Sequence, residues 1–428
     1  MQKILVMLRI DPNNRLYKLF KAYRPFRIFL AMFKFGAGLH YTLLAPLGEQ
    51  VMPLWIVGIL IGLGSMVQLI FDIPAWYLLD KYGYVRMLKL TTIAFIVAAF
   101  CLMFEFTSVT FILTLIFSSF WRLFFGPGAN AYTLSEAPKA DAGKFISFKE
   151  TFQSVGIVLA SAILAFIIPL PAVFIGVIIA MILIFAWLLL FITPEETVSV
   201  HVEKKIATHD YYIKKSYKHI RGILHKLSPV STMLMLSNFA SAIFYSFIRF
   251  VVPLMIANNQ GWRRMGIGLG VFDFAVVIFW YTIGKIADRY SKKKLVFLGL
   301  LIFAFAGILL WFNFGILFII LWFIATTGDE LASISLRAWL NTVEKTHTND
   351  GKISWAINLA SDLWRWVGPM LAGILYVLVG PSITITIGGW ILIATLAIYY
   401  FLIKKNGLSL EDDVATDMPK PHRFRHKS

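Results

Sequence analysis

The sequence predicts an all-α polytopic membrane protein with twelve transmembrane helices in two pseudo-symmetric six-helix bundles. Three observations lead to this prediction: an apolar composition, twelve apolar runs of spanning length, and a repeat that relates the two halves of the chain. Of the 428 residues, 59% are hydrophobic and 15% are charged, and the mean hydropathy is +0.75. Soluble domains contain about a quarter charged residues, so the composition excludes the cytosolic and secreted globular classes.

The apolar runs have the length that a bilayer requires. A helix needs about 20 apolar residues to cross the hydrocarbon core. An even number of such helices leaves both ends of the chain on one side of the membrane. The runs lie at about 26–46, 54–78, 88–106, 109–131, 146–168 and 172–193, and at about 229–256, 265–287, 293–313, 315–340, 352–378 and 382–403.

Turn-forming residues mark several of the expected boundaries. Pro53 precedes the second run, a Pro-Leu-Pro sequence that begins at Pro169 separates the fifth from the sixth, and Gly380-Pro381 precedes the twelfth. Proline lacks a backbone donor and glycine allows unusual backbone angles, so both favour breaks between helices. A single cysteine, Cys101, excludes an internal disulfide framework.

The basic residues indicate the orientation of the chain. Of the 40 Lys and Arg residues, 34 fall in loops and tails on one side or at the adjoining ends of the runs, 2 (Arg263 and Arg264) fall on the other side, and 4 lie deeper within the runs. Lys and Arg mark the cytoplasmic side, so we expect a cell-membrane protein with both termini in the cytoplasm. The net charge of +17 therefore reflects topology and contact with membrane lipids, and no nucleic-acid partner is expected.

The runs and the polar segments between them divide the chain into five parts. The N-terminal arm mixes apolar and basic residues without a signal-peptide cleavage site, which favours a helix on the membrane surface. The parts are a cytoplasmic amphipathic arm (1–25), an N-terminal six-helix bundle (26–193), a cytoplasmic basic linker (194–228), a C-terminal six-helix bundle (229–403) and a cytoplasmic tail (404–428).

A repeat of 208 residues relates the two bundles. Matching residues occur in the second span, in the loop that follows it and in the loop before the fifth span. Duplicated six-span units are typical of secondary transporters, whose substrate lies near the bilayer midplane between the repeats. The pairs are Gly58 with Gly266, Gly62 with Gly270, Asp80 with Asp288, and Gly143-Lys144 with Gly351-Lys352.

The loops after the second and eighth spans carry the same motif. The segment from Gly284 to Lys294 reads GKIADRYSKKK, and the segment from Asp80 to Arg86 reads DKYGYVR. Both resemble the loop signature of the major facilitator superfamily, G-x-L-A-D-R-x-G-R-K. An acidic residue followed by basic residues at a helix end can form charge pairs in one conformation that break in another. The residues expected to form this conformational switch are Asp80, Gly83, Arg86, Gly284, Asp288, Arg289 and Lys292.

The fourth span contains a second element of that family. The segment from Arg122 to Gly128 resembles its R-x-x-x-G-x-G element, in which the arginine faces the cavity and is linked to proton transfer in proton-coupled exporters. A structural ion pair between Arg122 and a carboxylate such as Glu150 is the alternative. The exporter element G-x-x-x-G-P-x-x-G-G of the fifth span is absent, since Thr151 to Ser161 contains only Gly156 and no proline.

Charged residues within the spans are costly and are therefore functional candidates. A carboxylate in low-dielectric surroundings favours its neutral form, so it can load and release a proton. Asp329, Glu330, Asp362 and Arg122 are the proton-coupling candidates. Adjacent helical residues point about 100° apart, so we expect one of Asp329 and Glu330 to pair with Arg365.

The polar residues of several spans are candidates for the substrate cavity. At about 1.5 Å per residue, Arg249 and Asp273 both lie roughly 12 Å from the outer ends of their spans. They are therefore plausible partners, either in a structural ion pair or in a gate. No metal-ligand spacing and no catalytic set is present, so neither a metal site nor a catalytic residue is expected. The cavity candidates are Lys34, His40, Gln153, Arg249, Asp273 and Arg365.

The resemblance implies a secondary active transporter that moves a small molecule by alternating access. We expect coupling to protons and export of amphipathic compounds, with a proton symporter, a facilitative uptake carrier or a lipid transporter of the same family as alternatives. A non-transporting sensor and a membrane-embedded transferase are further alternatives. The sequence has no phosphate-binding Gly-rich loop, so ATP is not expected to drive transport. The outward loops are only a few residues long and contain no catalytic set, so no enzyme activity and no cofactor are expected. Expected partners are the substrate, protons and membrane lipids, and the chain is expected to act as a monomer.

Overall fold

The computed structural model describes residues 23–104, 107–136, 142–167, 172–194, 229–260, 290–310, 316–346 and 352–405, and five single residues between 274 and 286. These residues form helices and turns and no strand. The helices are α3 (Arg24–Val51), α4 (Leu54–Tyr82), α5 (Tyr84–Cys101), α6 (Ser108–Glu136), α7 (Ala142–Ile167), α8 (Ala172–Leu189), α10 (Pro229–Gln260), α12 (Lys292–Leu309), α13 (Ile316–Thr346) and α14 (Lys352–Lys405).

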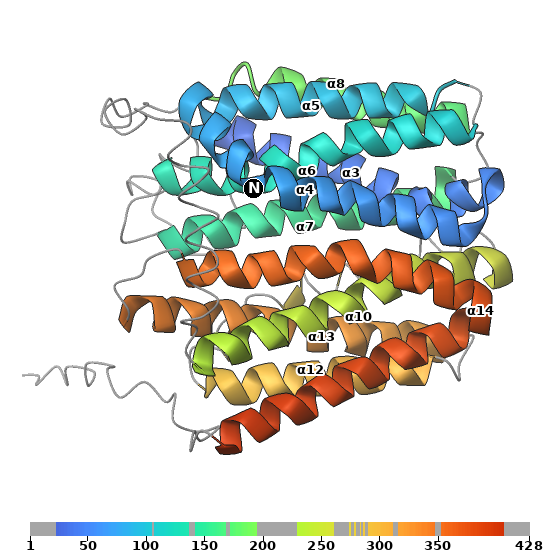
Figure 1. Cartoon of the computed structure of the whole chain (residues 1–428). Helices are drawn as coiled ribbons and strands as arrows, with labels where there is room; N and C mark the ends of the chain where they lie inside the picture. The colour runs from blue at the N-terminus through green and yellow to red at the C-terminus, as the bar shows by residue number, and fades with distance from the viewer. Residues whose placement is uncertain are drawn as a thin grey trace, which may run out of the picture.

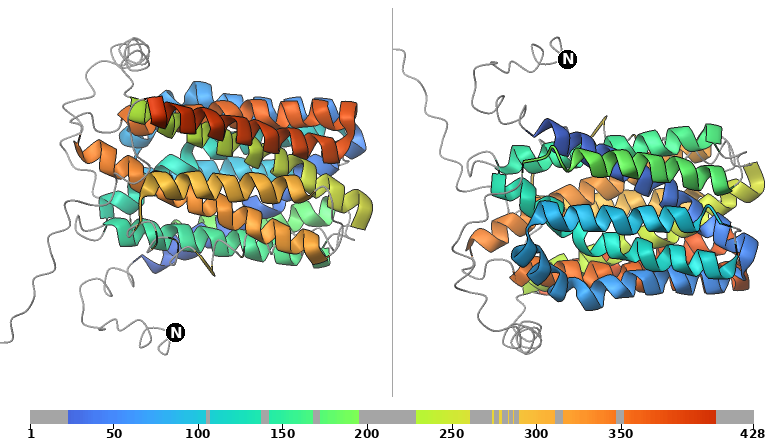
Figure 2. Two further views of the ribbon diagram at one scale, coloured as in Figure 1. Left: turned by 90° about the horizontal axis from the view of Figure 1, so that it is seen from below. Right: turned by 90° about the horizontal axis from the view of Figure 1, so that it is seen from above.

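The helices lie side by side along one direction, in two groups (Figure 1). Helices α3 to α8 form one group and α10 to α14 form the other, and the two groups cover opposite sides of the bundle (Figure 2). The prediction of an all-α polytopic membrane protein is confirmed. The first six spans correspond to α3–α8, the seventh to α10, the ninth and tenth to α12 and α13, and the last two to α14. The expected eighth span, 265–287, lies outside the described residues apart from the five single ones.

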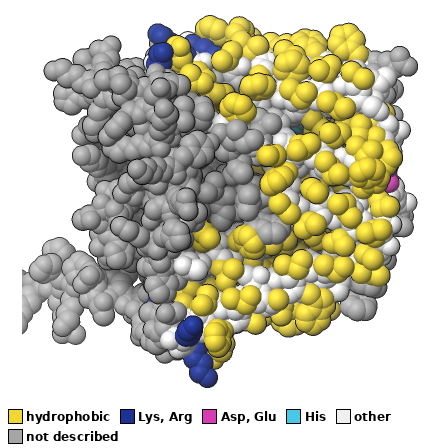
Figure 3. Space-filling view, viewed as in Figure 1, with side chains coloured by type: hydrophobic (Ala, Val, Ile, Leu, Met, Phe, Trp, Pro, Cys, Tyr) yellow, Lys and Arg dark blue, Asp and Glu magenta, His cyan; other side chains and the backbone are white. Residues whose placement is uncertain are grey.

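Most of the described helices contain an apolar segment that suits a membrane. Six of them, α3, α5, α6, α10, α13 and α14, contain segments of spanning length, and α4, α7 and α8 contain shorter apolar segments. On the face shown in Figure 3, hydrophobic side chains cover most of the described surface, and Lys and Arg gather toward the end at which α14 finishes. An apolar outer surface is what contact with hydrocarbon requires.

Glycines with positive φ form two sharp turns. Gly83 alone connects α4 to α5, with φ of 89°, and its N–H donates to the Leu79 carbonyl at 3.0 Å. Gly380 has φ of 82° and separates the two spans that run through α14. In the second half, Ser291 occupies the position 208 residues after Gly83 and caps α12, its hydroxyl accepting from the Lys294 N–H at 3.5 Å. The two copies of the repeated loop therefore use different residues at this position: a glycine with positive φ in the first copy and a serine N-cap in the second.

Close backbone contact joins the two halves along α4 and α14. A Cβ atom on Gly58 would lie 2.6 Å from the Pro369 carbonyl oxygen and 3.1 Å from Gly373 Cα, and one on Gly62 would lie 2.5 Å from the Trp366 carbonyl oxygen. Small residues let membrane helices approach to this degree. We call the end of the bundle at which α3 and α10 finish the outer end, and Gly58 and Gly62 lie in the part of α4 nearest to it.

Apolar packing also joins the halves at the outer end. The N-terminal half has its own core of buried side chains on α3, α5, α6, α7 and α8. The core of the C-terminal half continues into the N-terminal half through Leu44, Ala45, Leu54, Val57, Phe111 and Leu115. All six lie near the outer ends of α3, α4 and α6, so the outer end of the bundle is closed.

We predict that Gly58→Ala opens the outer end. The added methyl group would clash with the backbone of α14, and overpacking of this kind costs about 1–3 kcal/mol. The readout is oxidative crosslinking of Glu49→Cys with Asn258→Cys in a Cys101→Ala background, because the Glu49 side chain of α3 lies close to Asn258 of α10 across the halves. We expect a crosslinking yield about tenfold lower.

The matched control is Gly126→Ala, since a Cβ on Gly126 meets no atom within 4 Å. This variant is expected to crosslink like the parent. Equal crosslinking of the Gly58→Ala variant and the parent would contradict the role of the α4–α14 contact in closing the outer end.

Candidate functional site

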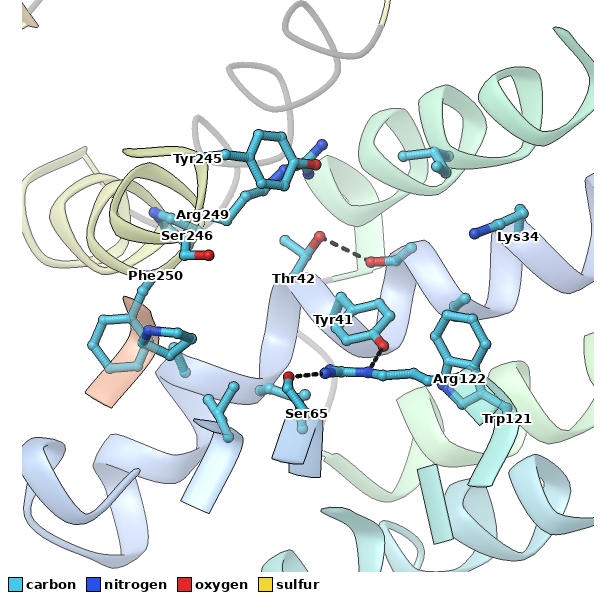
Figure 4. A pocket seen from close by; sticks show the side chains of 18 of the residues that line it. Lys34, Tyr41, Thr42, Ser65, Trp121, Arg122, Tyr245, Ser246, Arg249 and Phe250 are labelled. Carbon is cyan, nitrogen blue, oxygen red and sulfur yellow. Dashed lines mark hydrogen bonds between the residues drawn. The ribbon is translucent and has the colours of Figure 1, made fainter. Parts of the chain in front are cut away.

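A cavity of about 430 Å³ lies between the two halves. Helices α3, α4, α6 and α7 line it from one half, and α10 and α14 line it from the other (Figure 4). Pro369 of α14 lines the cavity, and its carbonyl is also the group that Gly58 of α4 approaches. The cavity therefore begins where the contact between the halves ends.

Three basic side chains line the cavity at mid-depth. Lys34 is 17 residues from the end of α3, Arg122 is 14 residues from the start of α6, and Arg249 is 11 residues from the end of α10. At about 1.5 Å per residue these positions lie roughly 25, 21 and 16 Å from the outer helix ends. The three helices have 28, 29 and 32 residues, so they are longer than the hydrocarbon core of about 30 Å and extend beyond it, and the charges lie well inside the helices.

Arg122 links three helices of the N-terminal half. Its Nε donates to the Tyr41 hydroxyl of α3, and its Nη1 donates to the Ser65 hydroxyl of α4 at 2.6 Å. The guanidinium carbon also lies 4.6 Å from the centroid of the Tyr41 ring. Both hydrogen-bond acceptors are neutral, and the side chain of Glu150, the carboxylate proposed as the structural partner, lies outside the described residues.

The other two cavity cations rest against aromatic rings. The Lys34 Nζ lies 5.3 Å from the Trp121 ring centroid and 5.1 Å from that of Phe125. The Arg249 Nε donates to the Tyr245 hydroxyl at 2.9 Å, one turn earlier on α10, and the guanidinium lies 5.2 Å from the Tyr245 ring. Aromatic faces attract cations, which offsets part of the cost of holding these charges away from water.

Two residues expected in the cavity lie elsewhere. His40 is 1% exposed and packs edge-on against Tyr41 and Phe95, and neither ring nitrogen has a hydrogen-bond partner among the described residues. Gln153 is buried on α7. Neither is among the described residues that line the cavity. His40 follows Leu39 on the side of α3 that packs into the N-terminal core, about 100° around the helix from Tyr41.

Asp329 lies inside the C-terminal half, beside the cavity-lining helix α10. It is 7% exposed on α13, and one of its carboxylate oxygens accepts from the Ser241 hydroxyl of α10 at 2.6 Å. Glu330 follows it with a half-buried side chain. Ser241, Tyr245 and Arg249 are spaced by four residues, so they share one face of α10. That face connects the buried carboxylate to the cavity.

Several predicted site residues lie outside the described part of the chain. The expected pairs of Arg249 with Asp273 and of Arg365 with a carboxylate therefore remain predictions. Among the switch residues, Gly83 forms the α4–α5 turn, Arg86 is exposed and Lys292 begins α12. The residues outside the description are Asp273, Gly284, Asp288 and Arg289, together with the side chains of Asp80, Asp362 and Arg365.

The structure adds residues that the sequence reasoning missed. Tyr41 and Ser65 hold Arg122, and Tyr245 holds Arg249. Tyr245 had a sequence signal, because it precedes Arg249 by four residues and so lies on the same helix face. Tyr41 and Ser65 had none, because each lies on a different helix from Arg122 and meets it only through tertiary packing.

Comparisons with known proteins support one family. The sequence profile of the Major Facilitator Superfamily matches residues 28–230. Among solved structures, the nucleoside transporter NupG has a TM-score of 0.68 at 13% identity and covers 89% of this chain and 99% of its own. The xylose transporter XylE from E. coli, in a partially occluded inward-open conformation, has a TM-score of 0.65 at 14% identity, with 88% and 96% covered.

The human organic anion transporter MFSD10 has a TM-score of 0.62 at 12% identity, with 88% of this chain and 98% of that chain covered. At these identities the likeness shows a common fold. No curated protein sequence matches the chain significantly.

We predict that Arg122→Leu lowers the stability of the N-terminal half. The substitution removes the two hydrogen bonds that the charged guanidinium donates, so the Tyr41 and Ser65 hydroxyls lose this donor. The expected loss is about 2 kcal/mol, seen as a lower Tm of the purified protein in detergent. Lys404→Leu, at an exposed position, is the control and should leave Tm unchanged. A Tm that rises in Arg122→Leu would show that the cost of burying the charge exceeds the value of both bonds.

Proposed function

We propose that this chain, which belongs to the major facilitator superfamily on its sequence match and its fold, is a secondary transporter that moves a small organic molecule across the cell membrane by alternating access. The observation that carries the proposal is the mid-depth cavity between two helical halves that are packed together at one end. Membership in this family of transporters also favours transport over catalysis.

Alternating access needs two halves that separate at one end while they meet at the other. The glycine contact of α4 with α14 and the apolar cluster close the outer end. Rocking of one half against the other around a fixed site would open that end and close the opposite one. The cavity-lining prolines Pro127 of α6, Pro253 of α10 and Pro369 of α14 each lie inside a helix, which favours local bending during such a motion.

The outer end is proposed to face the cell exterior. Lys81, Arg86, Lys404 and Lys405 lie at the opposite end of the described helices, where Lys and Arg also gather on the surface (Figure 3). Basic residues favour the cytoplasmic side. On this orientation both termini are cytoplasmic, and the structure corresponds to a state closed toward the exterior.

Proton coupling is proposed to act through Asp329. This carboxylate is buried and accepts a hydrogen bond from Ser241, on the α10 face that also carries Arg249. A change in its charge would alter the interaction between α13 and α10, and α10 lines the cavity. Glu330 and Asp362 are the other candidates. The aromatic lining suits amphipathic compounds, which favours export of such compounds, with proton-coupled or facilitated uptake as the alternative.

We predict that Asp329→Asn abolishes transport driven by a pH gradient while substrate exchange continues. The asparagine keeps a hydrogen-bond acceptor for Ser241 and cannot carry the proton. One proton per substrate supports about a tenfold accumulation for each pH unit, and the variant is expected to accumulate none. The measurement is gradient-driven flux in proteoliposomes, beside counterflow without a gradient.

The same assay includes Ser241→Ala and, as its control, Ser237→Ala, whose hydroxyl donates to the Met233 carbonyl of its own helix at 2.9 Å. Gradient-driven accumulation by Asp329→Asn equal to that of the parent would exclude Asp329 as the proton site. Glu330→Gln and Asp362→Asn would then be tested in the same way.

The proposed orientation predicts which engineered cysteines are accessible from outside. In a Cys101→Ala background, a membrane-impermeant maleimide should label Gln260→Cys in intact cells, because α10 ends there at the outer end. It should label Ser199→Cys in the basic linker only after the cells are permeabilised. Labelling of Ser199→Cys in intact cells would reverse the orientation.

A further inference from the structure

We propose that the substrate binds beside the α3 wall of the central cavity, and that Ala37 on this wall and Tyr245 on the opposite α10 wall set the largest substrate that fits. The inference rests on the proposed transport function and adds to it two residues that determine specificity. It follows from the repeat, which relates the two walls position by position, and from the difference in side-chain size between them.

The repeat of 208 residues relates the described helices as well as the sequence motifs. Helix α5 spans Tyr84–Cys101 and α12 spans Lys292–Leu309, so both ends of α12 lie 208 positions after those of α5. Helices α6 and α13 begin at Ser108 and Ile316, which are also 208 positions apart. Equivalent residues of these helices are therefore found by adding 208 to the residue number.

Contacts between the helices follow the same relation. In the N-terminal half, the Phe33 ring of α3 packs edge-on against Trp121 of α6, with their centroids 5.6 Å apart. The residues 208 positions later are Ser241 of α10 and Asp329 of α13, and they are hydrogen-bonded at 2.6 Å. The chemistry of the two contacts differs, but both halves bring the same positions together. Helices α10 and α13 therefore face each other as α3 and α6 do.

A second pair of contacts shows the same relation on the other side of the two wall helices. A Cβ atom on Gly38 of α3 would lie 2.8 Å from the Ala160 Cβ of α7. A Cβ atom on Gly368 of α14 would lie 2.4 Å from the Ser246 Cβ of α10, and these are the equivalent positions. Helix α10 thus has the same rotation and the same close approach in its half as α3 has in the other half.

The cavity uses equivalent positions of α3 and α10. Residues 37, 38, 41, 42 and 45 of α3 line it, and so does the α10 residue 208 positions after each of them. Ala37 is 14 residues from the end of α3 and Tyr245 is 15 residues from the end of α10, so the two lie at similar depth. The walls that α3 and α10 form are therefore directly comparable (Figure 4).

The α3 wall carries the smaller side chains. At four of the five equivalent pairs the α10 residue is the larger one, and the difference is greatest for Ala37 with Tyr245 and for Thr42 with Phe250. Protein interiors are closely packed, so a small residue leaves space at its own position when the backbones around it are equivalent. The open part of the cavity therefore lies beside α3, across from Tyr245.

Contacts within α10 hold Tyr245 in position. Its hydroxyl accepts a hydrogen bond from the Arg249 Nε at 2.9 Å, and the Arg249 guanidinium lies 5.2 Å from its ring. A ring held in this way forms a fixed boundary of the binding space. The cavity volume of about 430 Å³ is near the lower end of the range for small-molecule sites, which suits a compound of one or two rings.

The first test measures the space beside α3 without a known substrate. Thr42→Cys is introduced into the purified full-length protein in a Cys101→Ala background and treated with methyl, benzyl and naphthylmethyl methanethiosulfonate. Mass spectrometry gives the rate of modification, and each rate is divided by that of the same reagent with Lys404→Cys, at an exposed position. Overpacking costs about 1–3 kcal/mol, so we expect the naphthylmethyl reagent to react about tenfold more slowly than the benzyl reagent.

Variants of the two size-determining residues shift this limit in opposite directions. Tyr245→Ala should raise the rate of the naphthylmethyl reagent about tenfold, and Ala37→Tyr should lower the rate of the benzyl reagent about tenfold. The matched control is Tyr245→Phe, which keeps the ring and removes the hydroxyl that Arg249 contacts, and it should react like the parent. Unchanged rates in Tyr245→Ala and Ala37→Tyr, or equal acceleration by Tyr245→Phe, would overturn the inference.

The combined variant Ala37→Tyr with Tyr245→Ala tests on which wall the space lies. It exchanges the two residues between the walls and keeps the total side-chain volume. We expect Thr42→Cys to stay as slow as in Ala37→Tyr alone, because the space has moved to α10. Recovery of the parent rate would overturn the placement beside α3. If Ala37→Tyr fails to fold, Ala37→Leu replaces it in both variants.

Counterflow in proteoliposomes separates the failure of this inference from the failure of the transport proposal. The panel consists of membrane-impermeant compounds with one, two or three rings. We expect Tyr245→Ala to move larger compounds than the parent does, and Ala37→Tyr to move only smaller ones. Movement with the same size limit in all variants would overturn this inference and leave transport standing. If nothing moves although the labelling rates follow the expected order, the transport proposal fails and the assignment of the space stands.

Discussion

The backbone contact between α4 and α14 is the constraint on which the rest of the structure depends. At Gly58 and Gly62 the two helices meet without intervening side chains, and apolar residues of α3, α4 and α6 join the opposite core beside them. Pro369 belongs both to this contact and to the cavity wall. A rearrangement of the contact would therefore change the cavity as well, which gives a direct physical route from the closure of one end to the geometry of the site.

The site stabilises charged side chains that are costly to hold away from water. Three basic side chains lie well inside the helices, and each is held by groups that stabilise a cation: two hydroxyls and a ring for Arg122, a hydroxyl and a ring for Arg249, and two rings for Lys34. These partners come from the same half as the cation that they hold. These contacts orient the cations within each half before a ligand binds.

Helix α10 connects the two chemical centres. Its successive turns carry Ser241 against Asp329, Tyr245 against the Arg249 side chain, and Arg249 itself at the cavity. A rigid helix transmits a small displacement along its length, so a change of charge at Asp329 and the binding of a ligand near Arg249 act on the same element. This shared element offers a physical basis for coupling between a proton and a substrate.

The sequence by itself determined the secondary structure, the membrane location of the helices and the break at Gly380. These follow from the thickness of the hydrocarbon core, from the need to satisfy every backbone group within it, and from the backbone freedom of glycine, all of which act locally along the chain. Only the tertiary structure decided which polar residues meet. Lys34, Arg122 and Arg249 are far apart in sequence and share a cavity, whereas His40, beside Tyr41, packs into a core. The sequence shows Gly58 and Gly62 as part of a repeat, but it does not show that they contact α14. The rotation of each helix and the partner that it faces are set by packing between distant segments, and no local pattern records that packing.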